Sequence, residues 1–455
     1  MPATPTIRTL SGTSAQVINA IRNSASVDYR NFVPYVNPDS DSIRAVGNII
    51  MQMPMLQNEF CNLLINRIAK VVITSKMYSN PWKEFKKGIL EVGETVEDIF
   101  VDLQEAQPFD PEYDENRAFA RDKPDVLAAF YPINSQVYYE VTISQSELRK
   151  AFATVEGVVD LVNKIIERVY AAYEYDELIS MKYLVARHIL DGHLHPETIS
   201  AMTSANASAN VAAIKGVSNA IEFPDPAYNL AGVHNHSLKE DQYLILSSTA
   251  DAQVDVMVLA AAFHMDKAEF MGHRKLINSW QFSAGELARL DKLFGGYPAY
   301  REITSGDNSA LANVQGVLVD RDFFQVYDAL LEMRQIENPR TLSYNHFLHV
   351  WRTYAISPFA PAVVFTSAAG SITSVTVSPA TVSVPKGGQY SFTAAVVASG
   401  IVDQSVTWSA TSGTMDANGT LHVPATAETS STITVTATSN ADSTKTDTAT
   451  VTVTA

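Results

Sequence analysis

The stretch Gly157–Leu190, with the sequence GVVDLVNKIIERVYAAYEYDELISMKYLVARHIL, decides the fold of this chain. Apolar residues recur along it at helical spacing, and after Gly157 it contains neither proline nor glycine. This pattern predicts one long helix with an apolar stripe. At 1.5 Å per residue such a helix is roughly 45 to 50 Å long. We therefore expect a spine that spans the whole subunit.

Residues 89–143, which precede this helix, read as a long excursion with two extended arms around a polar, acidic stretch. Apolar residues alternate along both arms, which predicts strands with one face to cover. Because loops this long rarely close a compact core, we expect a β-hairpin arm that lies on a neighbouring subunit. We expect the apolar residues of the second arm to be partly exposed in the isolated subunit. The inter-subunit candidates are Ile99, Val101 and Leu103 on the first arm and Val137, Tyr139, Val141 and Ile143 on the second.

The remaining sequence before residue 370 predicts a mixture of helices and strands. Residues 14–70 read as helices with an irregular passage around Pro34 and Pro38. After the spine, apolar runs predict strands at 243–246, 316–319 and 362–365 and helices at 255–264 and 323–332. This mixture predicts an α+β fold.

The composition changes near residue 370, after the small-residue linker Ser367-Ala-Ala-Gly370. Residues 371–455 are rich in Thr, Val, Ser and Ala, and the run Thr448-Ala-Thr-Val-Thr-Val-Thr454 alternates strictly. A period of two in β-branched residues predicts half-buried strands of an all-β sandwich. Trp408 fits the core tryptophan of such a sandwich better than a platform for stacking a sugar.

Composition narrows the functional class. The chain has 455 residues, which suggests two to four domains, and 46% of them are hydrophobic. A formal net charge of -16 argues against sequence-independent nucleic-acid binding, which needs a basic surface. The single cysteine, Cys61, excludes an internal disulfide framework and fits a reducing cytosol. We recognise no signal peptide and no apolar run of the ~20 residues that span a bilayer, so we expect a soluble protein.

Motifs for catalysis or metal binding are weak or missing. The pairs His193/His195 and His234/His236 have metal-ligand spacing, but turn residues flank them and no third ligand follows, so we interpret them as loop histidines. The acidic stretch 102–115 lacks the order of a calcium loop, and we interpret it as a solvated or partner-facing arm. The sequence contains no Gly-X-Ser-X-Gly elbow and no phosphate-binding glycine loop. We therefore predict no active site, no metal and no cofactor.

Several stretches in chain order carry a family resemblance, among them Asn80-Pro-Trp-Lys-Glu-Phe-Lys-Lys-Gly88. Together they resemble the major capsid proteins of the phi-twenty-nine-like short-tailed phages. In the C-terminal part, Val375-Thr-Val-Ser-Pro379 and Val406-Thr-Trp-Ser409 resemble a bacterial Ig-like domain of group 2. The other matching stretches of the first part are residues 17–24, 66–73, 256–265, 317–328, 338–342 and 349–351.

The resemblance implies the Hong-Kong-ninety-seven-type capsid fold in a capsid domain of residues 1–369, followed by the Ig-like domain at 371–455. Its parts would be an N-arm (about 1–75), an extended hairpin called the E-loop (about 76–145), a peripheral domain with the spine helix (about 157–190), and an axial domain (about 191–345).

The resemblance also implies a structural function. Copies would self-assemble as pentamers and hexamers into a phage head that encloses double-stranded DNA, with a scaffolding protein during assembly and a portal complex as partners. Assembly would take place in the cytoplasm of the bacterial host, and the product would be the virion capsid. We expect the Ig-like domain to brace neighbouring capsomers, to bind glycans of the host surface weakly, or to do neither. The alternatives are an encapsulin-like protein container and a surface adhesin with an Ig-like module.

Overall fold

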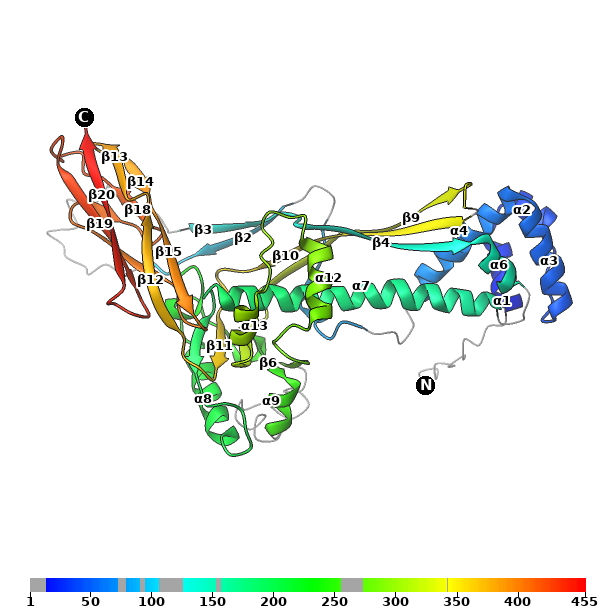
Figure 1. Cartoon of the computed structure of the whole chain (residues 1–455), viewed down its shortest axis with the longest axis horizontal. Coiled ribbons are helices and arrows are strands. Elements are labelled where there is room, and N and C mark those ends of the chain that lie inside the picture. The colour runs from blue at the N-terminus through cyan, green and yellow to red at the C-terminus, as the bar shows by residue number, and fades with distance from the viewer. Residues whose placement is uncertain are drawn as a thin grey trace.

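The computed structural model describes residues 14–72, 79–90, 95–104, 106, 126–152, 157–254, 273–341 and 343–455. The molecule is elongated, as Figure 1 shows. A group of N-terminal helices lies at one end, a β-sandwich that contains the C-terminus lies at the other, and one long helix runs between them.

The N-terminal end is helical, as the sequence predicts. The side chains of Ser26 and Asp39 cap two of its helices by accepting hydrogen bonds from the amides of Tyr29 and Ser42. Pro54 opens another helix, where its missing N–H group costs nothing. The apolar faces of these helices share one core with Val169, Tyr170 and Tyr173 of the spine. The helices are α1 (Ser14–Ser24), α2 (Val27–Phe32), α3 (Ser40–Gln52) and α4 (Pro54–Val72).

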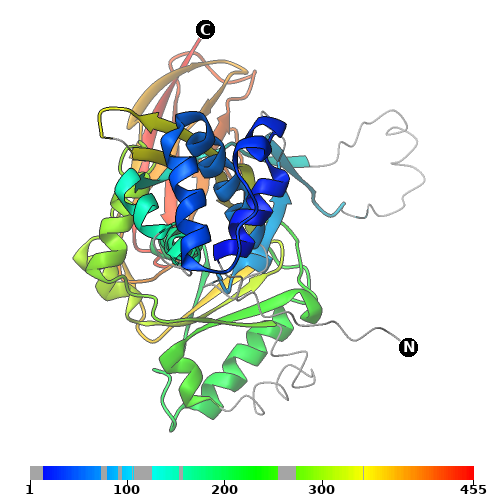
Figure 2. The ribbon, with the colours of Figure 1, turned by 90° about the vertical axis from the view of Figure 1, so that its right-hand side faces the viewer.

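The predicted spine is confirmed as helix α7 (Gly157–Leu190), which has 34 residues. A shorter helix, α6 (Gln145–Ala151), precedes it and begins with a capping box between Ser144 and Glu147. Along α7, Val169, Tyr170 and Tyr173 belong to the core of the N-terminal end. Further on, Ile179, Val185 and Ile189 belong to a second core. The helix therefore ties two cores together, and Figure 2 looks along it from the N-terminal helices.

A four-stranded sheet in the order β1-β9-β10-β4 runs beside the spine. Strand β1 is parallel to β9, and β10 is antiparallel to both β9 and β4. The helix predicted at 323–332 is wrong, because these residues lie almost entirely in β9. Hydrogen bonding to β10 along nearly the whole strand outweighs the helix propensity of the segment 329–333. The strands are β1 (Lys86–Ile89), β4 (Ser135–Ser144), β9 (Phe324–Asn338) and β10 (Ser343–Ile356).

The second sheet has five strands in the order β5-β11-β8-β6-β7. The strands predicted at 243–246, 316–319 and 362–365 are present in it, and the α+β prediction is confirmed. The helix predicted at 255–264 lies outside the described residues. The strands are β5 (His195–Thr198), β6 (Gln242–Ser247), β7 (Arg274–Ile277), β8 (Val314–Asp320) and β11 (Ala362–Thr366). The accompanying helices are α8 (Ala207–Ala220), α9 (Ser248–Gln253), α12 (Ala284–Phe294) and α13 (Ser305–Leu311), with short 3-10 turns at Lys83–Phe85, Pro226–Tyr228 and Lys239–Asp241.

The hairpin arm exists, but its second strand differs from the expected one. Strand β2 (Val96–Val101) pairs antiparallel with β3 (Val126–Tyr131) and not with β4. Pro132 follows β3 directly and ends the hairpin there, since proline has no N–H group to donate to a strand ladder. Strand β4, which we interpreted as the second arm, belongs to the long sheet.

The C-terminal residues form the predicted all-β sandwich. Its core consists of the inward residues of alternating strands, such as Ile433, Val435, Val451 and Val453, each at most 2% exposed. The three groups of paired strands are β12 (Ser371–Ser378) with β15 (Thr393–Ser399); β13 (Thr381–Pro385), β20 (Thr446–Thr454), β19 (Thr432–Ser439) and β16 (Val406–Ala410); and β14 (Gln389–Ser391), β18 (Thr420–His422) and β17 (Thr414–Met415).

Candidate assembly surfaces

The hairpin β2–β3 has an apolar outward face. Side chains alternate between the two faces of each strand, and the outward ones remain exposed in this subunit. Ile99 and Phe130 are each 59% exposed, and Val101 and Val126 are 54% and 51% exposed. Leu103, just beyond β2, is 63% exposed. The three first-arm candidates therefore lie on a surface that this subunit leaves uncovered.

The inward face of the hairpin is held on the subunit by polar contacts. Asp98 accepts hydrogen bonds from the hydroxyls of Tyr131, at 3.0 Å, and Ser357, at 2.6 Å. Next to this contact, Phe100 stacks on Phe359 with ring centres 5.6 Å apart. Burial and the Asp98 carboxylate raise the pKa of Tyr131, so its hydroxyl keeps its proton. These contacts fix the direction in which the hairpin leaves the body.

A further contact lies at the outer end of β2. The Asp102 carboxylate accepts a hydrogen bond from the backbone N–H of His234 at 3.1 Å, and its Oδ1 lies 3.2 Å from the Nδ1 of that residue. Burial raises the pKa of Asp102, but hydrogen bonds from the Leu103 and His234 amides outweigh this effect and lower it. Most of the predicted acidic stretch 102–115 lies outside the described residues.

The second-arm candidates lie in the subunit's own core. Val141 is 7% exposed and Ile143 is 1% exposed, so the expectation that they are partly exposed in the isolated subunit is wrong. Val137 and Tyr139 are half-buried against the same core, and the Tyr139 hydroxyl donates to Asp176 of the spine. The physical reason is that the spine covers this face of β4. The missed second arm, β3, has its own signal in the short, continuous apolar run 126–131, which ends at Pro132.

The opposite face of the long sheet carries an aromatic stripe, which we define as Tyr138, Phe347 and His349. The ring centres of Tyr138 lie 5.8 Å from those of both Phe347 and His349. These residues alternate with the core residues Val137, Leu348 and Val350, so they point away from the spine. Tyr138 is 60% exposed. Sequence reasoning missed this surface because its residues come from two strands that are far apart in the chain.

A buried charge cluster joins the spine to the long sheet. Lys86 Nζ lies 3.1 Å from Glu177 of α7 and 2.5 Å from Asp328 of β9. Arg352 of β10 pairs with both carboxylates, and its Nε lies 2.6 Å from Asp328. Burial raises the pKa of Asp328, but Arg352 and Lys86 outweigh this effect and lower it. These four groups neutralise one another and join β1, β9 and β10 of the sheet to the spine.

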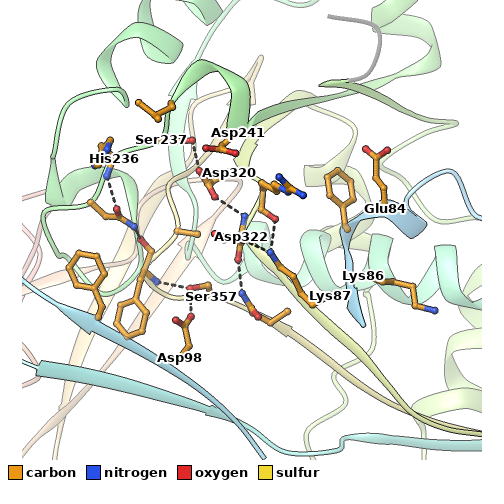
Figure 3. A pocket seen from close by; sticks show the side chains of 18 residues that line it. Glu84, Lys86, Lys87, Asp98, His236, Ser237, Asp241, Asp320, Asp322 and Ser357 are labelled. Atoms are coloured by element: carbon orange, nitrogen blue, oxygen red, sulfur yellow. Dashed lines mark hydrogen bonds and ion pairs between the residues drawn. The ribbon is translucent and has the colours of Figure 1, made fainter. Parts of the chain in front are cut away.

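A pocket of about 640 Å³ lies at the root of the hairpin (Figure 3). Its charged side chains are largely paired: Lys87 contacts Asp322, and the Ser237 hydroxyl donates to Asp320. Burial raises the pKa of Asp320. Within the described ranges, no group of three or more His, Cys, Asp or Glu side chains is placed to hold a metal ion. We interpret the pocket as a polar joint beneath the hairpin.

The histidine pairs and Cys61 are placed separately. His193 lies against His188, with their Nδ1 atoms 2.7 Å apart, whereas His195 packs on Tyr228. Of the second pair, His234 contacts Asp102 and His236 lines the root pocket. Neither pair therefore converges on one point. Cys61 is fully buried, and burial together with Glu337 raises its pKa to about 12.

The Ig-like domain is anchored on the end of the spine. Ile401, in the loop between β15 and β16, is 4% exposed and belongs to the same core as Val185 and Ile189. The Gln404 side chain donates a hydrogen bond to the carbonyl of Leu190 at 2.8 Å. Trp408 is half-buried against the sandwich core, and its ring centre lies 6.5 Å from that of Phe392. None of the helices within the described ranges is long and apolar enough to cross a membrane.

Comparison with known proteins gives two consecutive matches. The sequence model of the family described as "Phi29-like phage major capsid protein" matches residues 18–366, and that of "Bacterial Ig-like domain (group 2)" matches residues 371–454. The major capsid protein of Bacillus phage PZA is 33% identical over 405 residues, which cover 88% of this chain and 84% of that protein. The major capsid protein of Streptococcus phage Cp-1 is 26% identical over 352 residues, which cover 73% of this chain and 88% of that protein. A chain from the capsid structure of Staphylococcus phage Andhra aligns with a TM-score of 0.48 and 12% identity over 65% of this chain and 86% of that one.

Proposed function

This chain belongs to the Phi29-like phage major capsid protein family, and from this premise we propose how its copies hold one another in a closed shell. It is a structural major capsid protein of a tailed bacteriophage and a component of the virion. Its capsid domain has the expected Hong-Kong-ninety-seven-type fold, and a bacterial Ig-like domain follows it. The match over residues 18–366 favours this function over a protein container or a surface adhesin.

The observation that carries the proposal is the two-faced hairpin. Its polar inward side, through Asp98, is tied to its own subunit, whereas its outward side presents Ile99, Val101, Val126 and Phe130 to solvent. An apolar face that stays uncovered in a subunit marks a protein contact. We propose that this face lies on the aromatic stripe of a neighbouring copy, where Tyr138 is 60% exposed and Phe347 and His349 are half-buried.

Burial of this apolar surface against a neighbour contributes enough free energy to hold subunits together. Each ~100 Å² of apolar surface that a neighbour covers contributes roughly 2.5 kcal/mol before the entropy cost of association. Since the contact needs area and no unique bond, the same hairpin serves at the slightly different angles within pentamers and hexamers. The buried charge cluster keeps the spine and long sheet rigid, so the angles change between subunits and not within them.

The other partners follow from this function. We propose a scaffolding protein during assembly in the cytoplasm of the bacterial host, and a portal complex at one vertex. The shell encloses double-stranded DNA without recognising its sequence. The net charge of -16 supports an inner wall that repels the phosphate groups of the DNA. A basic inner face in the assembled particle would contradict the last point.

The Ig-like domain has two candidate roles. The anchoring of Ile401 and Gln404 on the spine supports bracing, because force on the domain passes directly into the capsid domain. Binding of host-surface glycans is the second candidate. The position of Trp408, with much of its ring against the sandwich core, favours the structural role of that residue.

Electron microscopy of particles assembled by hairpin variants tests the proposal. Phe130→Asp places a charge on the outward face and, because Phe130 is already 59% exposed, leaves the free subunit folded. Phe223→Asp is the matched control, since Phe223 is 70% exposed and lies outside the hairpin. We expect Phe130→Asp to reduce the yield of closed particles by about tenfold or more while the control assembles. Normal particles from Phe130→Asp would contradict the proposal.

A further inference from the structure

One edge of the Ig-like domain is open. Strand β15 (Thr393–Ser399) pairs with β12 on one side, and no described strand pairs with its other side. Between Ala394 and Ser399, the backbone groups have no described hydrogen bonds other than those to β12. An open edge presents a row of N–H and C=O groups, which is a template for another strand.

This edge lacks the features that usually prevent strand addition. Such features are charges, proline and short length. The end strand β13 contains Pro385 and is followed by Lys386, and the end strand β16 borders a cleft with the carboxylates of Asp403 and Asp416. By contrast, β15 has seven residues with the sequence TAAVVAS, and its outward Val397 is 53% exposed.

The charge distribution favours a second copy as the occupant. Copies with a net charge of -16 repel one another over most of their surface. Residues 371–402, which contain both β12 and β15, have Lys386 as their only charged residue. This region is therefore a place where two copies approach without electrostatic cost.

There is also space beside the strand. A cleft of about 480 Å³ separates residues 396–400 from the end of the spine and from α13. The charged residues on its far wall are two cations and two carboxylates that pair with one another: Arg187 with Asp191 at 2.6 Å and with Asp307 at 3.6 Å, and Arg301 with Asp191. They leave no net charge to repel a neutral strand. The small side chains of β15 allow the ~4.8 Å spacing of paired strands.

We propose that β15 pairs antiparallel with β15 of a second copy, so that Ig-like domains of neighbouring capsomers are joined by a continuous sheet across a twofold axis. This inference rests on the proposed function and specifies the contact through which the Ig-like domain would brace neighbouring capsomers. An isologous contact of this kind uses the same surface on both copies and closes on itself. It joins subunits in pairs and does not propagate.

Cysteine cross-linking in assembled particles of the full chain tests this pairing. Directly opposite residues of paired strands point to the same face of the sheet. A twofold axis between two β15 strands therefore lies midway between one residue of β15 and the same residue of the second copy. Cα atoms of such a pair are roughly 4.5 to 5.5 Å apart, within the range for a disulfide. Because Cys61 is fully buried, a single introduced cysteine is the accessible thiol.

We would replace each residue from Thr393 to Ser399 singly by cysteine and oxidise the particles. Thr450→Cys is the matched control, since Thr450 is exposed but lies on the central strand β20. We expect one position to give disulfide-linked dimers at about tenfold or more above the control, with lower yields at its neighbours. Closed particles in which no position exceeds the control would overturn this inference alone. Failure of the unmodified chain to form particles would overturn the proposed function and this inference with it.

Discussion

The carboxylate of Asp98 in β2 accepts a hydrogen bond from the hydroxyl of Ser357, with 2.6 Å between Oδ2 and Oγ, although 259 positions separate the two residues in the chain. This contact ties the hairpin to the loop that follows β10. It therefore decides where the hairpin's apolar face points when a neighbour arrives.

Ser357→Ala removes this contact and leaves the hydrogen bond from Tyr131 in place. A hydrogen bond to a charged group contributes about 1.5 to 3 kcal/mol, so we expect amide exchange in Val96–Val101 and Val126–Tyr131 to accelerate by about tenfold or more. Hydrogen–deuterium exchange measures the amide exchange rates in these two strands. Ser391→Ala, in the Ig-like domain, is the control. Unchanged exchange in the hairpin would show that Ser357 does not hold it.

Arg352→Met tests the charge cluster between the spine and the long sheet. The Arg352 side chain is 3% exposed, and its loss leaves Glu177 and Asp328 with Lys86 alone among the cluster's cations. Breaking a buried ion pair on one side costs about 3 to 5 kcal/mol of unfolding free energy. Arg334→Met is the control, because the exposed Arg334–Glu332 pair contributes at most about 1 kcal/mol. Urea unfolding that gives equal losses for both variants would contradict the assigned role.

Two buried histidines make the subunit sensitive to acid. Burial and His193 lower the pKa of His188 to about 4, and burial alone lowers the pKa of His346 to about 4, from an ordinary value of 6.5. Between pH 6.5 and 4 the unfolded chain binds protons that the folded chain does not, so stability falls as the pH falls. Each histidine contributes a slope of about 1.4 kcal/mol per pH unit inside this window.

His346→Leu isolates one of these contributions, since both ring nitrogens of His346 are buried and have no described hydrogen-bond partner. We expect the variant to lose less stability than the unmodified chain between pH 6 and 4.5, in unfolding experiments at matched ionic strength. Parallel pH curves would mean that His346 binds protons equally in the folded and the unfolded chain, which would contradict the lowered pKa.

Ile401→Ala tests the anchoring of the Ig-like domain. Truncation of a buried isoleucine costs about 2 to 5 kcal/mol, and here the cost falls on the joint between the domains. We expect faster proteolytic cleavage near the linker at 367–370, with each domain otherwise intact. Thr450→Ala, at an exposed position of β20, should leave the cleavage rate unchanged. Equal rates for both variants would mean that the joint does not depend on Ile401.

The local pattern of apolar residues was sufficient to predict some helices and strands and not others. The spine was predictable because apolar residues recur at helical spacing through its 34 residues, and the sandwich was predictable because runs such as 448–454 alternate strictly. Strand β9 was not predictable from its local sequence, because a helix-forming segment such as 329–333 becomes a strand only when β10 lies beside it.

The candidate surfaces show the same limit. Ile99, Val101 and Leu103 were found from their alternation. The burial of Val141 and Ile143 depends on the spine packing over β4, which no local pattern reveals. The aromatic stripe, the charge cluster and the Asp98–Ser357 contact each combine residues from distant segments, so they appear only once the chain is folded.

The most direct measurement of the central claim is hydroxyl-radical footprinting of the full chain before and after assembly. The side chains of Phe130 and Tyr138 are 59% and 60% exposed in the single subunit, so both should react readily in unassembled chains. In closed particles we expect both to be protected by about fivefold or more, because the hairpin of one copy covers the stripe of the next. Equal labelling of Phe130 and Tyr138 in unassembled chains and in closed particles would contradict the account.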